Sequence, residues 1–457
     1  MYRTLCLVAM STLLALPCRG EETVDAKETL IRLTVSPAAA PQPALKYTLL
    51  PEMRDMEPGN PVQGYMLGFM EQEKFFFDKQ TVERRDQLLK MPLAELPKDE
   101  VKDYGGSALK QADWAARLDH ADWQILLKLK AQGISLLIPD VQQLRVLARA
   151  LKVRFRGDVA DHRFDDAVRT AQTMFALSRH LGEHLTFIGN LVGGIVAHLA
   201  IDPLEEMIGQ PGCPNLYWAL TYLPSPLVRT DIGAQGERIW IGPMFRDLDD
   251  KAPLSEAQLK RVVAFFEKVV EGTKILGGKT LREWLDVQVK DNAVVAAARR
   301  RLADAGISPE RLSSFPAEQV LLLDEKRACI ERLDDVIKVV QLPASQVDAF
   351  SEQILAKGPI LFDMAPSFEK VKRAQIRLDQ RIALLRHVEA LRLYAAEHGK
   401  LPAKLSDISV PLPEDPFSGQ PFRYELNGKT AHLRGTAPKA EANNPTFNLH
   451  YELTLRN

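Results

Sequence analysis

The chain has 457 residues, of which 46% are apolar and 26% charged, and these values exclude wholesale disorder. Its 59 Lys and Arg residues nearly balance its 60 Asp and Glu residues, so the net charge is −1. A chain this neutral lacks the overall basic field that supports nucleic-acid binding, and we expect no nucleic-acid partner.

The first twenty residues, 1–20, have the three-part layout of a secretory signal peptide. Arg3 supplies a positive charge, residues 5–16 are almost wholly apolar, and small residues follow at Cys18 and Gly20. This apolar stretch is too short to span a bilayer stably, and no later run reaches that length. We therefore expect export to the periplasm or the extracellular space, and a mature chain that begins near Glu21 with no membrane span.

Residues 21–60 are predicted to form an extended N-terminal segment and a linker. Within it, residues 30–35 have the pattern of a short strand, and the stretch that follows is rich in Ala and Pro. A helix is expected to start near Val62. The segment therefore leads into the first helical part of the chain.

Residues 61–230 are predicted to form a helical-hairpin domain. Asp140 is the expected N-cap of one helix, and a second helix follows a turn at Gly157-Asp158. Small residues at the expected contact indicate an αα-hairpin of tetratricopeptide type. A third helix, 185–206, is rich in Gly and Ala, and this face is expected to pack against the hairpin.

A second helical region is predicted over residues 231–365. Ser255 and Gln258 have the spacing of a capping box that starts a helix, and Gly277-Gly278 is expected to end that helix. Further helices are predicted at 280–305, 316–342 and 345–355.

Residues 366–457 are predicted to form a long helix followed by a small antiparallel sheet. The helix covers 366–398 and ends at Gly399, a C′ glycine. Asn427-Gly428 is the expected hairpin turn between two of the strands. The predicted strands are 422–426, 430–434 and 448–455. The fold class predicted for the whole chain is therefore mainly α.

Several stretches of the chain resemble a group of large, uncharacterised secreted proteins predicted from planctomycete genomes. These stretches are Asp122-Trp123, LLIPDVQQLRVLARALKVRFRG and FDDAVRTAQTMFALSRHL within 136–181, LVGGIVAHLAI at 191–201, CPNLYWAL at 213–220, and the C-terminal ALRLYAAEHGKLPAKL and DPFSGQPFRY. Together they cover roughly half of the chain. The resemblance implies export and a helical core, and it implies no function.

The end of the chain also resembles the globular end of type II secretion pseudopilins, in its pattern of a helix followed by LP, DP, Gly and an aromatic residue. The helix of those proteins begins as a membrane anchor. Here Lys370, Lys372 and Arg373 make the helix amphipathic, so the resemblance implies shared local topology only.

The run His180-Leu181-Gly182-Glu183-His184 matches H-x-x-E-H, the zinc-binding pattern of inverzincins. On a helix, His180 and His184 would share one face and bind Zn²⁺, while Glu183 would activate a water molecule. The longer run HLGEHLTFIGN resembles the corresponding run of pitrilysin-type peptidases, whose third ligand, a Glu roughly 75 residues further on, has no clear counterpart here.

A structural interpretation competes with the zinc site. Gly182 weakens any helix that would have to hold the ligands. In this interpretation His180 closes one helix and Glu183 begins the next, because a basic group near a helix C-terminus and an acidic group near an N-terminus both complement the helix dipole.

Two function hypotheses follow from the sequence. The first is an exported, non-enzymatic interaction or scaffold protein without a cofactor, whose partner is an unknown protein or envelope component, because stacked helices expose concave surface and no complete catalytic motif occurs. The alternative is a zinc-dependent hydrolase, a peptidase, with Glu183 as catalytic base and with His180 and His184 as metal ligands. Cys213 and Cys329 are expected to remain unjoined.

Overall fold

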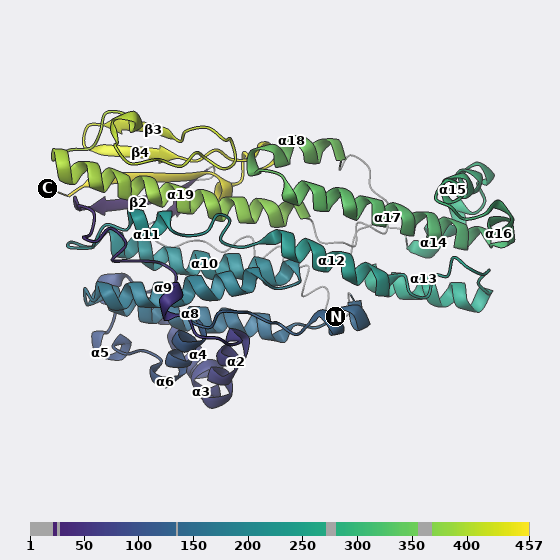
Figure 1. Ribbon diagram of the computed structural model, residues 1–457, viewed down its shortest axis with the longest axis horizontal. Helices are drawn as coiled ribbons and strands as arrows, with labels where there is room; N and C mark the ends of the chain where they lie inside the picture. The colour runs from purple at the N-terminus through teal and green to yellow at the C-terminus, as the bar shows by residue number, and fades with distance from the viewer. Residues whose placement is uncertain (1–21, 25–27, 134–135, 271–279, 355–367, 457) are drawn as a thin grey trace. The chain divides into compact units, whose positions relative to one another are not determined.

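The computed structural model of the protein describes residues 22–24, 28–133, 136–270, 280–354 and 368–456 (Figure 1). The fold is mainly helical and contains one small sheet. The described chain forms two compact units, a larger one from residues 22–124, 138–233 and 371–456 and a smaller one from Ile125–Leu137 and Ala234–Lys370. The predicted signal peptide, 1–20, lies outside the described residues.

The larger unit holds the three long central helices, the C-terminal helix and all of the described strands. Its helices are η1 (Met53–Asp55), α2 (Pro61–Glu71), α3 (Glu73–Phe77), α4 (Lys79–Lys90), η2 (Leu93–Glu95), α5 (Lys98–Val101), α6 (Gly106–Ala115), α8 (Pro139–Ala160), α9 (Phe164–Gly182), α10 (Phe187–Ile208), α11 (Tyr217–Thr221), most of α19 (Phe368–His398), η6 (Leu405–Asp407), η7 (Lys439–Glu441) and η8 (Pro445–Phe447). Its strands are β1 (Glu22–Val24), β2 (Thr29–Val35), β3 (Arg423–Asn427), β4 (Thr430–Arg434) and β5 (Leu449–Leu455).

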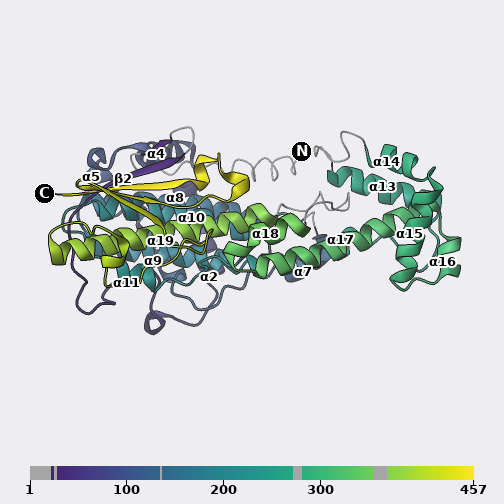
Figure 2. The same ribbon diagram turned by 90° about the horizontal axis from the view of Figure 1, so that it is seen from above.

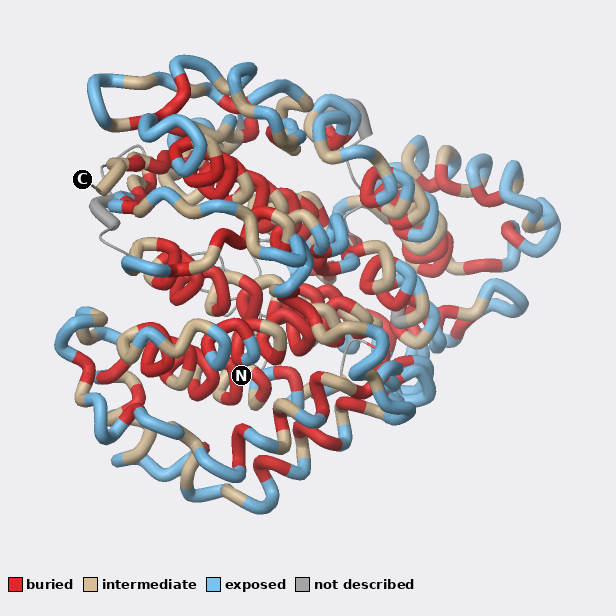
Figure 3. The backbone as a smooth tube through the Cα atoms, turned by 60° about the vertical axis from the view of Figure 1, so that its left-hand side comes forward, coloured by how far each residue is buried: buried red, intermediate tan, exposed pale blue. Residues whose placement is uncertain are grey.

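Helices α8, α9 and α10 form the centre of the larger unit, and each of them contacts the other two. Most of their residues are buried. Figure 3 shows such buried stretches along helices of the fold, and exposed residues in many of the loops. Alongside α10 lies α19, as the two ribbon views show (Figures 1 and 2) and as ion pairs between the two helices confirm.

The start and the end of α8 differ from the prediction. Its N-cap is Ile138, without a side-chain cap, and Asp140 lies inside the first turn because Pro139 already occupies the start of the helix. The helix also continues past Gly157 to Ala160. Gly157 is a packing residue, since a Cβ atom there would lie 2.9 Å from the carbonyl oxygen of Val101.

The sheet has the order β1-β2-β5-β4-β3. Its C-terminal strands β3, β4 and β5 pair antiparallel, as predicted, but the N-terminal strands β1 and β2 also join it and make the sheet mixed. The N-terminal strand β2 pairs in parallel with the C-terminal strand β5, from Thr29 opposite Leu449 to Val35 opposite Leu455. This pairing joins segments at opposite ends of the sequence, and strand patterns carry no signal for it. The hairpin turn lies at Gly428-Lys429, one residue later than predicted, because Asn427 pairs with Thr430.

The regular elements among the described residues of the smaller unit are all helices. Ser255 and Gln258 form the predicted capping box, and Asp291 caps a new helix, which splits the helix predicted over 280–305. Gly277-Gly278, predicted to end a helix, lies outside the described residues. The helices are α7 (Leu126–Gln132), α12 (Thr230–Met244, whose first four residues belong to the larger unit), α13 (Glu256–Val270), α14 (Leu281–Gln288), α15 (Asn292–Asp304), α16 (Pro309–Ser314), α17 (Ala317–Gln341) and α18 (Ala344–Ile354).

Candidate functional site

The H-x-x-E-H run crosses a helix end. Helix α9 ends at Gly182, and α10 begins only at Phe187, with Thr186 as its N-cap. His180 therefore lies in the last turn of α9, whereas Glu183 and His184 lie in the connection between the helices. The predicted start of a helix at Glu183 is wrong, because the Thr186 side chain accepts the hydrogen bond from the Gly189 backbone N–H and so fixes the start of α10.

Both imidazoles contact other parts of the larger unit. The hydroxyl of Tyr65 lies 3.0 Å from Nδ1 of His180, and the Trp123 indole N–H donates to the His180 carbonyl oxygen at 3.0 Å. The Trp123 ring also packs edge-on against His184, with 4.8 Å between ring centroids. Nδ1 of His184 accepts the backbone N–H of Thr186 at 3.2 Å. These contacts give each imidazole a role in holding α9 and its neighbours together.

Burial makes both imidazoles weak bases. It lowers the pKa of His180 to about 3, helped by the charge of Arg179, and it lowers the pKa of His184 to about 4. Burial also raises the pKa of Glu183. Both imidazoles are therefore neutral at pH 7, which a zinc ligand requires, but no group of three or more His, Cys, Asp or Glu side chains is placed to hold a metal ion among the described residues.

Asn190 of α10 forms hydrogen bonds to the backbone of the segment that connects α9 and α10. Its Nδ2 donates to the carbonyl oxygens of Gly182 at 3.1 Å and of His184 at 3.0 Å. It thereby satisfies carbonyl groups that the end of α9 leaves without helical partners. Its Oδ1 faces Gly233, where a Cβ atom would lie only 2.0 Å away.

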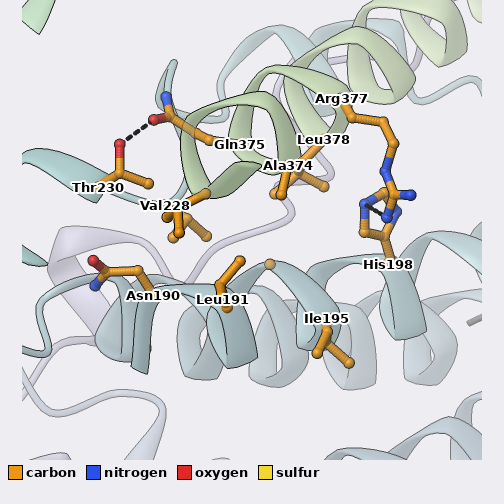
Figure 4. A pocket seen from close by; sticks show the side chains of 12 residues that line it. Asn190, Leu191, Ile195, His198, Val228, Thr230, Ala374, Gln375, Arg377 and Leu378 are labelled. Atoms are coloured by element: carbon orange, nitrogen blue, oxygen red, sulfur yellow. Dashed lines mark hydrogen bonds between the residues drawn. The ribbon is translucent and has the colours of Figure 1, made fainter. Parts of the chain in front are cut away.

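A groove beside Asn190 runs between α10 and α19 (Figure 4). Its cavity volume is about 30 Å³, which is room for a few water molecules. Side chains of α10 line it at one-turn spacing, since Asn190, Gly194 and His198 follow each other at intervals of four residues. The other lining residues are Leu191, Ile195, Val228, Thr230, Val371, Ala374, Gln375, Arg377 and Leu378.

The middle of the groove is apolar and its two ends are polar, as Figure 4 shows. At one end the Thr230 hydroxyl donates to Oε1 of Gln375 at 2.5 Å. At the other end Nη2 of Arg377 lies 3.4 Å from Nε2 of His198. The groove thus combines an apolar lining with a few polar groups at its ends.

His198 lies between two guanidinium groups, because Nη1 of Arg381 is 3.3 Å from its Nδ1. Burial lowers the pKa of His198 well below its usual value, and the charges of Arg377 and Arg381 lower it further, so this imidazole is neutral. A neutral imidazole has one acceptor nitrogen, so Arg377 and Arg381 cannot both donate to it. Two guanidinium groups therefore flank a neutral imidazole at this end of the groove.

A buried ion-pair network joins the walls of the groove. Arg381 of α19 pairs with Asp202 at 2.9 Å and with Glu205 at 2.7 Å, both on α10. Lys152 of α8 pairs with Asp202, and the Tyr451 hydroxyl of β5 donates to Glu205. Because removing one member of a buried pair leaves an uncompensated charge, loss of any one of these side chains would destabilise the packing of α10 and α19.

Gly194 lines the groove at a point where no neighbouring side chain or backbone crowds it. A Cβ atom there would meet nothing within 4 Å, whereas a Cβ atom on the preceding Gly193 would lie 2.9 Å from the Ser178 carbonyl oxygen. Close packing against α9 therefore explains Gly193 and does not explain Gly194. The sequence predicted that this Gly-rich face packs against the hairpin, but it contains no signal that one glycine would face an open groove.

Comparison of the chain with known protein-family models, with curated proteins and with solved structures finds no match. Among the described residues, α10 is the one helix long and apolar enough to cross a membrane, and 72% of its most apolar window is buried in the fold. That degree of burial is typical of a core helix. Cys213 and Cys329 are both buried and form no disulfide, so they are unjoined, as predicted.

Proposed function

We propose that this protein is an exported, non-enzymatic interaction protein and that the groove between α10 and α19 is its binding site. The proposal includes removal of residues 1–20 on export and a partner that is an envelope component or another protein. It also includes the tetratricopeptide-like character of the α8–α9 hairpin, which stays a prediction from the sequence.

The observation that carries the proposal is the open space at Gly194. A glycine in a helix interior costs about 1 kcal/mol relative to alanine, and no crowding neighbour requires one at Gly194. At Gly194 the glycine instead keeps the groove open. The contacts of His180 with Tyr65 and of His184 with Thr186 further support a structural role for the H-x-x-E-H run.

A zinc-dependent hydrolase remains the alternative, with Glu183 as catalytic base. One observation favours it, because Nε2 of His180 is buried and has no hydrogen-bond partner among the described residues. A metal ion would give that nitrogen a partner. If the protein binds no zinc, Nε2 of His180 stays buried without a partner, which costs about 1–3 kcal/mol of stability.

Elemental analysis of the mature protein, purified without a histidine tag, decides between the two functions. We expect no stoichiometric zinc in the wild type, in His180→Ala or in His184→Ala. We expect His180→Ala to lower the free energy of unfolding by about 1–3 kcal/mol, because the Tyr65 hydroxyl loses its buried partner. One zinc ion per wild-type chain that either substitution removes would overturn the proposal and establish the hydrolase.

A further inference from the structure

We propose that a second site, a polar cavity beside α9, binds a hydroxyl-rich organic acid of the sugar-acid class, with its carboxylate between Arg117 and Arg169. The cavity shares no lining residue with the groove between α10 and α19, so this inference goes beyond the proposed function. It follows from the size of the cavity, from two arginines without a carboxylate partner, and from the polar groups in the rest of the lining.

The cavity has a volume of about 630 Å³, within the range of about 300–1,000 Å³ that is usual for small-molecule sites. One wall is a face of α9, because Asp165, Arg169 and Gln172 follow each other at intervals of four and three residues. Arg117 and side chains from residues 46–57 form the other walls. All of these residues belong to the larger unit.

Hydrogen bonds hold the N-terminal wall against α9. Nε2 of Gln172 donates to the Thr48 carbonyl oxygen at 3.1 Å, and the Tyr47 hydroxyl donates to Asp165 at 2.9 Å. The walls are therefore fixed before a ligand binds, which reduces the entropy that binding costs.

Arg117 has neutral hydrogen-bond partners. Its Nη1 donates to the Asp113 carbonyl oxygen at 2.6 Å, and its Nη2 donates to Oε1 of Gln172 at 3.3 Å. The Asp113 carboxylate is already occupied by Arg154, which donates to its two oxygens at 2.9 and 2.6 Å. Within the described ranges no carboxylate forms an ion pair with Arg117, so this half-buried charge has no counter-ion at ion-pair distance.

Arg169 lies at the same end of the cavity, since it is one helical turn from Gln172, which Arg117 contacts. Its exposed guanidinium forms no hydrogen bond or ion pair with any other described residue. Burial lowers the pKa of Arg117, the charge of Arg169 lowers it further, and Asp113 and Asp55 offset only part of this effect. Two neighbouring guanidinium groups without a counter-ion attract an anion, and their geometry matches a carboxylate.

The rest of the lining favours hydroxyl groups over alkyl groups. Apart from Met56 and Val168, every lining side chain carries a polar group, and an alkyl chain would bury these groups without partners. The carboxylates of Asp55 and Glu57 can accept hydrogen bonds from ligand hydroxyl groups. The same carboxylates repel a second negative charge, so the cavity favours a ligand with a single carboxylate.

The test measures binding of glucuronate to the mature protein by isothermal titration calorimetry. Glucose lacks the carboxylate, hexanoate lacks the hydroxyl groups, and glucose 6-phosphate carries a second negative charge. We expect glucuronate to bind at one site per chain and about tenfold more tightly than each of these three probes. No binding of glucuronate, or equal binding of any of the three, would overturn the inference.

Substitutions of exposed arginines locate the site. Arg169→Gln should weaken glucuronate binding about tenfold, and Arg169→Lys, which keeps the charge but not the planar fork, should have intermediate affinity. Arg423→Gln is the matched control, because Arg423 is exposed on β3 and does not line the cavity. Thermal unfolding monitored by circular dichroism confirms that each variant is folded. Undiminished binding to folded Arg169→Gln would contradict the assignment.

Gly194→Leu separates the two sites, because it fills the groove between α10 and α19 and does not line this cavity. We expect it to bind glucuronate as tightly as the wild type. Loss of glucuronate binding in folded Gly194→Leu would place the ligand in the groove and overturn the inference. Failure of glucuronate to bind at all leaves the proposed function standing.

Discussion

His180 shows how burial changes what a side chain can do. The sequence places it in a zinc-binding pattern, and the fold buries it to 1% exposure beside Tyr65. The sequence could predict the local event, the end of a helix near Gly182, because glycine and histidine are typical of helix C-termini. It could not predict Tyr65 or Trp123 as neighbours, since these residues come from distant parts of the chain.

The low pKa of His180 predicts a loss of stability in acid. Its pKa is about 3 in the folded protein and about 6.5 in the unfolded chain. Above pH 6.5 both states are neutral and the full stability is present. As the pH falls from 6.5 toward 3, only the unfolded chain takes up the proton, so stability falls by up to about 1.4 kcal/mol per pH unit.

The variant His180→Asn removes this proton uptake and keeps a polar group near the Tyr65 hydroxyl. Between pH 7 and pH 5 we expect the wild type to lose about 2 kcal/mol more stability than the variant, measured by urea unfolding at each pH. His162→Asn is the control, because His162 is exposed and Asn tolerates its positive φ of 56°. If the free energy of unfolding falls equally with pH in His180→Asn and in the wild type, the pKa argument is wrong.

At the scale of single elements, α10 packs closely against neighbouring residues on one face and borders the groove on the next. One face lies so close to its neighbours that it requires glycine at two positions, Gly189 against the His184 side chain and Gly193 against Ser178 of α9. The adjacent face borders the groove at Gly194. The Gly-rich and Ala-rich composition predicted a closely packed helix over 185–206, and the helix observed is Phe187–Ile208. Composition cannot distinguish a glycine that packs from one that leaves space, because both look the same in the sequence.

The two adjacent glycines make a matched test of this account. We expect Gly193→Ala to lower the free energy of unfolding by about 1–3 kcal/mol, because its Cβ atom would clash with Ser178. We expect Gly194→Ala to raise it by up to about 1 kcal/mol, because alanine favours the helix and nothing crowds the new methyl group. Urea unfolding measures both values, and a change of the same sign in the two variants would contradict the assigned roles.

At the scale of the whole molecule, the larger unit is held together by long-range contacts. Strand β2 from the N-terminal part pairs with β5 from the C-terminal part, and the Tyr451 hydroxyl of β5 reaches Glu205 of α10. The sequence predicted β2 and β5 almost to the residue, since alternating burial of Ile31, Leu33 and Val35 leaves a local pattern. Their parallel pairing leaves no such pattern and could not be predicted.

Like the pairing of β2 with β5, the groove is formed by segments that are far apart in the sequence. Its walls, α10 and α19, were both predicted as helices, but the contacts that join them are distant in sequence. Arg381, for example, pairs with Asp202 and Glu205 across 179 and 176 residues. A site built from segments so far apart has no linear motif. The one local trace of it is Gly194, a glycine that the packing of its helix does not require.

The most direct test of the binding function is capture of envelope components by the mature protein. Wild type, Gly194→Ala and Gly194→Leu are each incubated with the same envelope extract, recovered, and analysed for retained lipids and proteins by mass spectrometry. The account predicts one component retained near one per chain by the wild type and Gly194→Ala, and reduced at least tenfold by Gly194→Leu. Equal retention by Gly194→Leu, or nothing retained by the wild type, would contradict it.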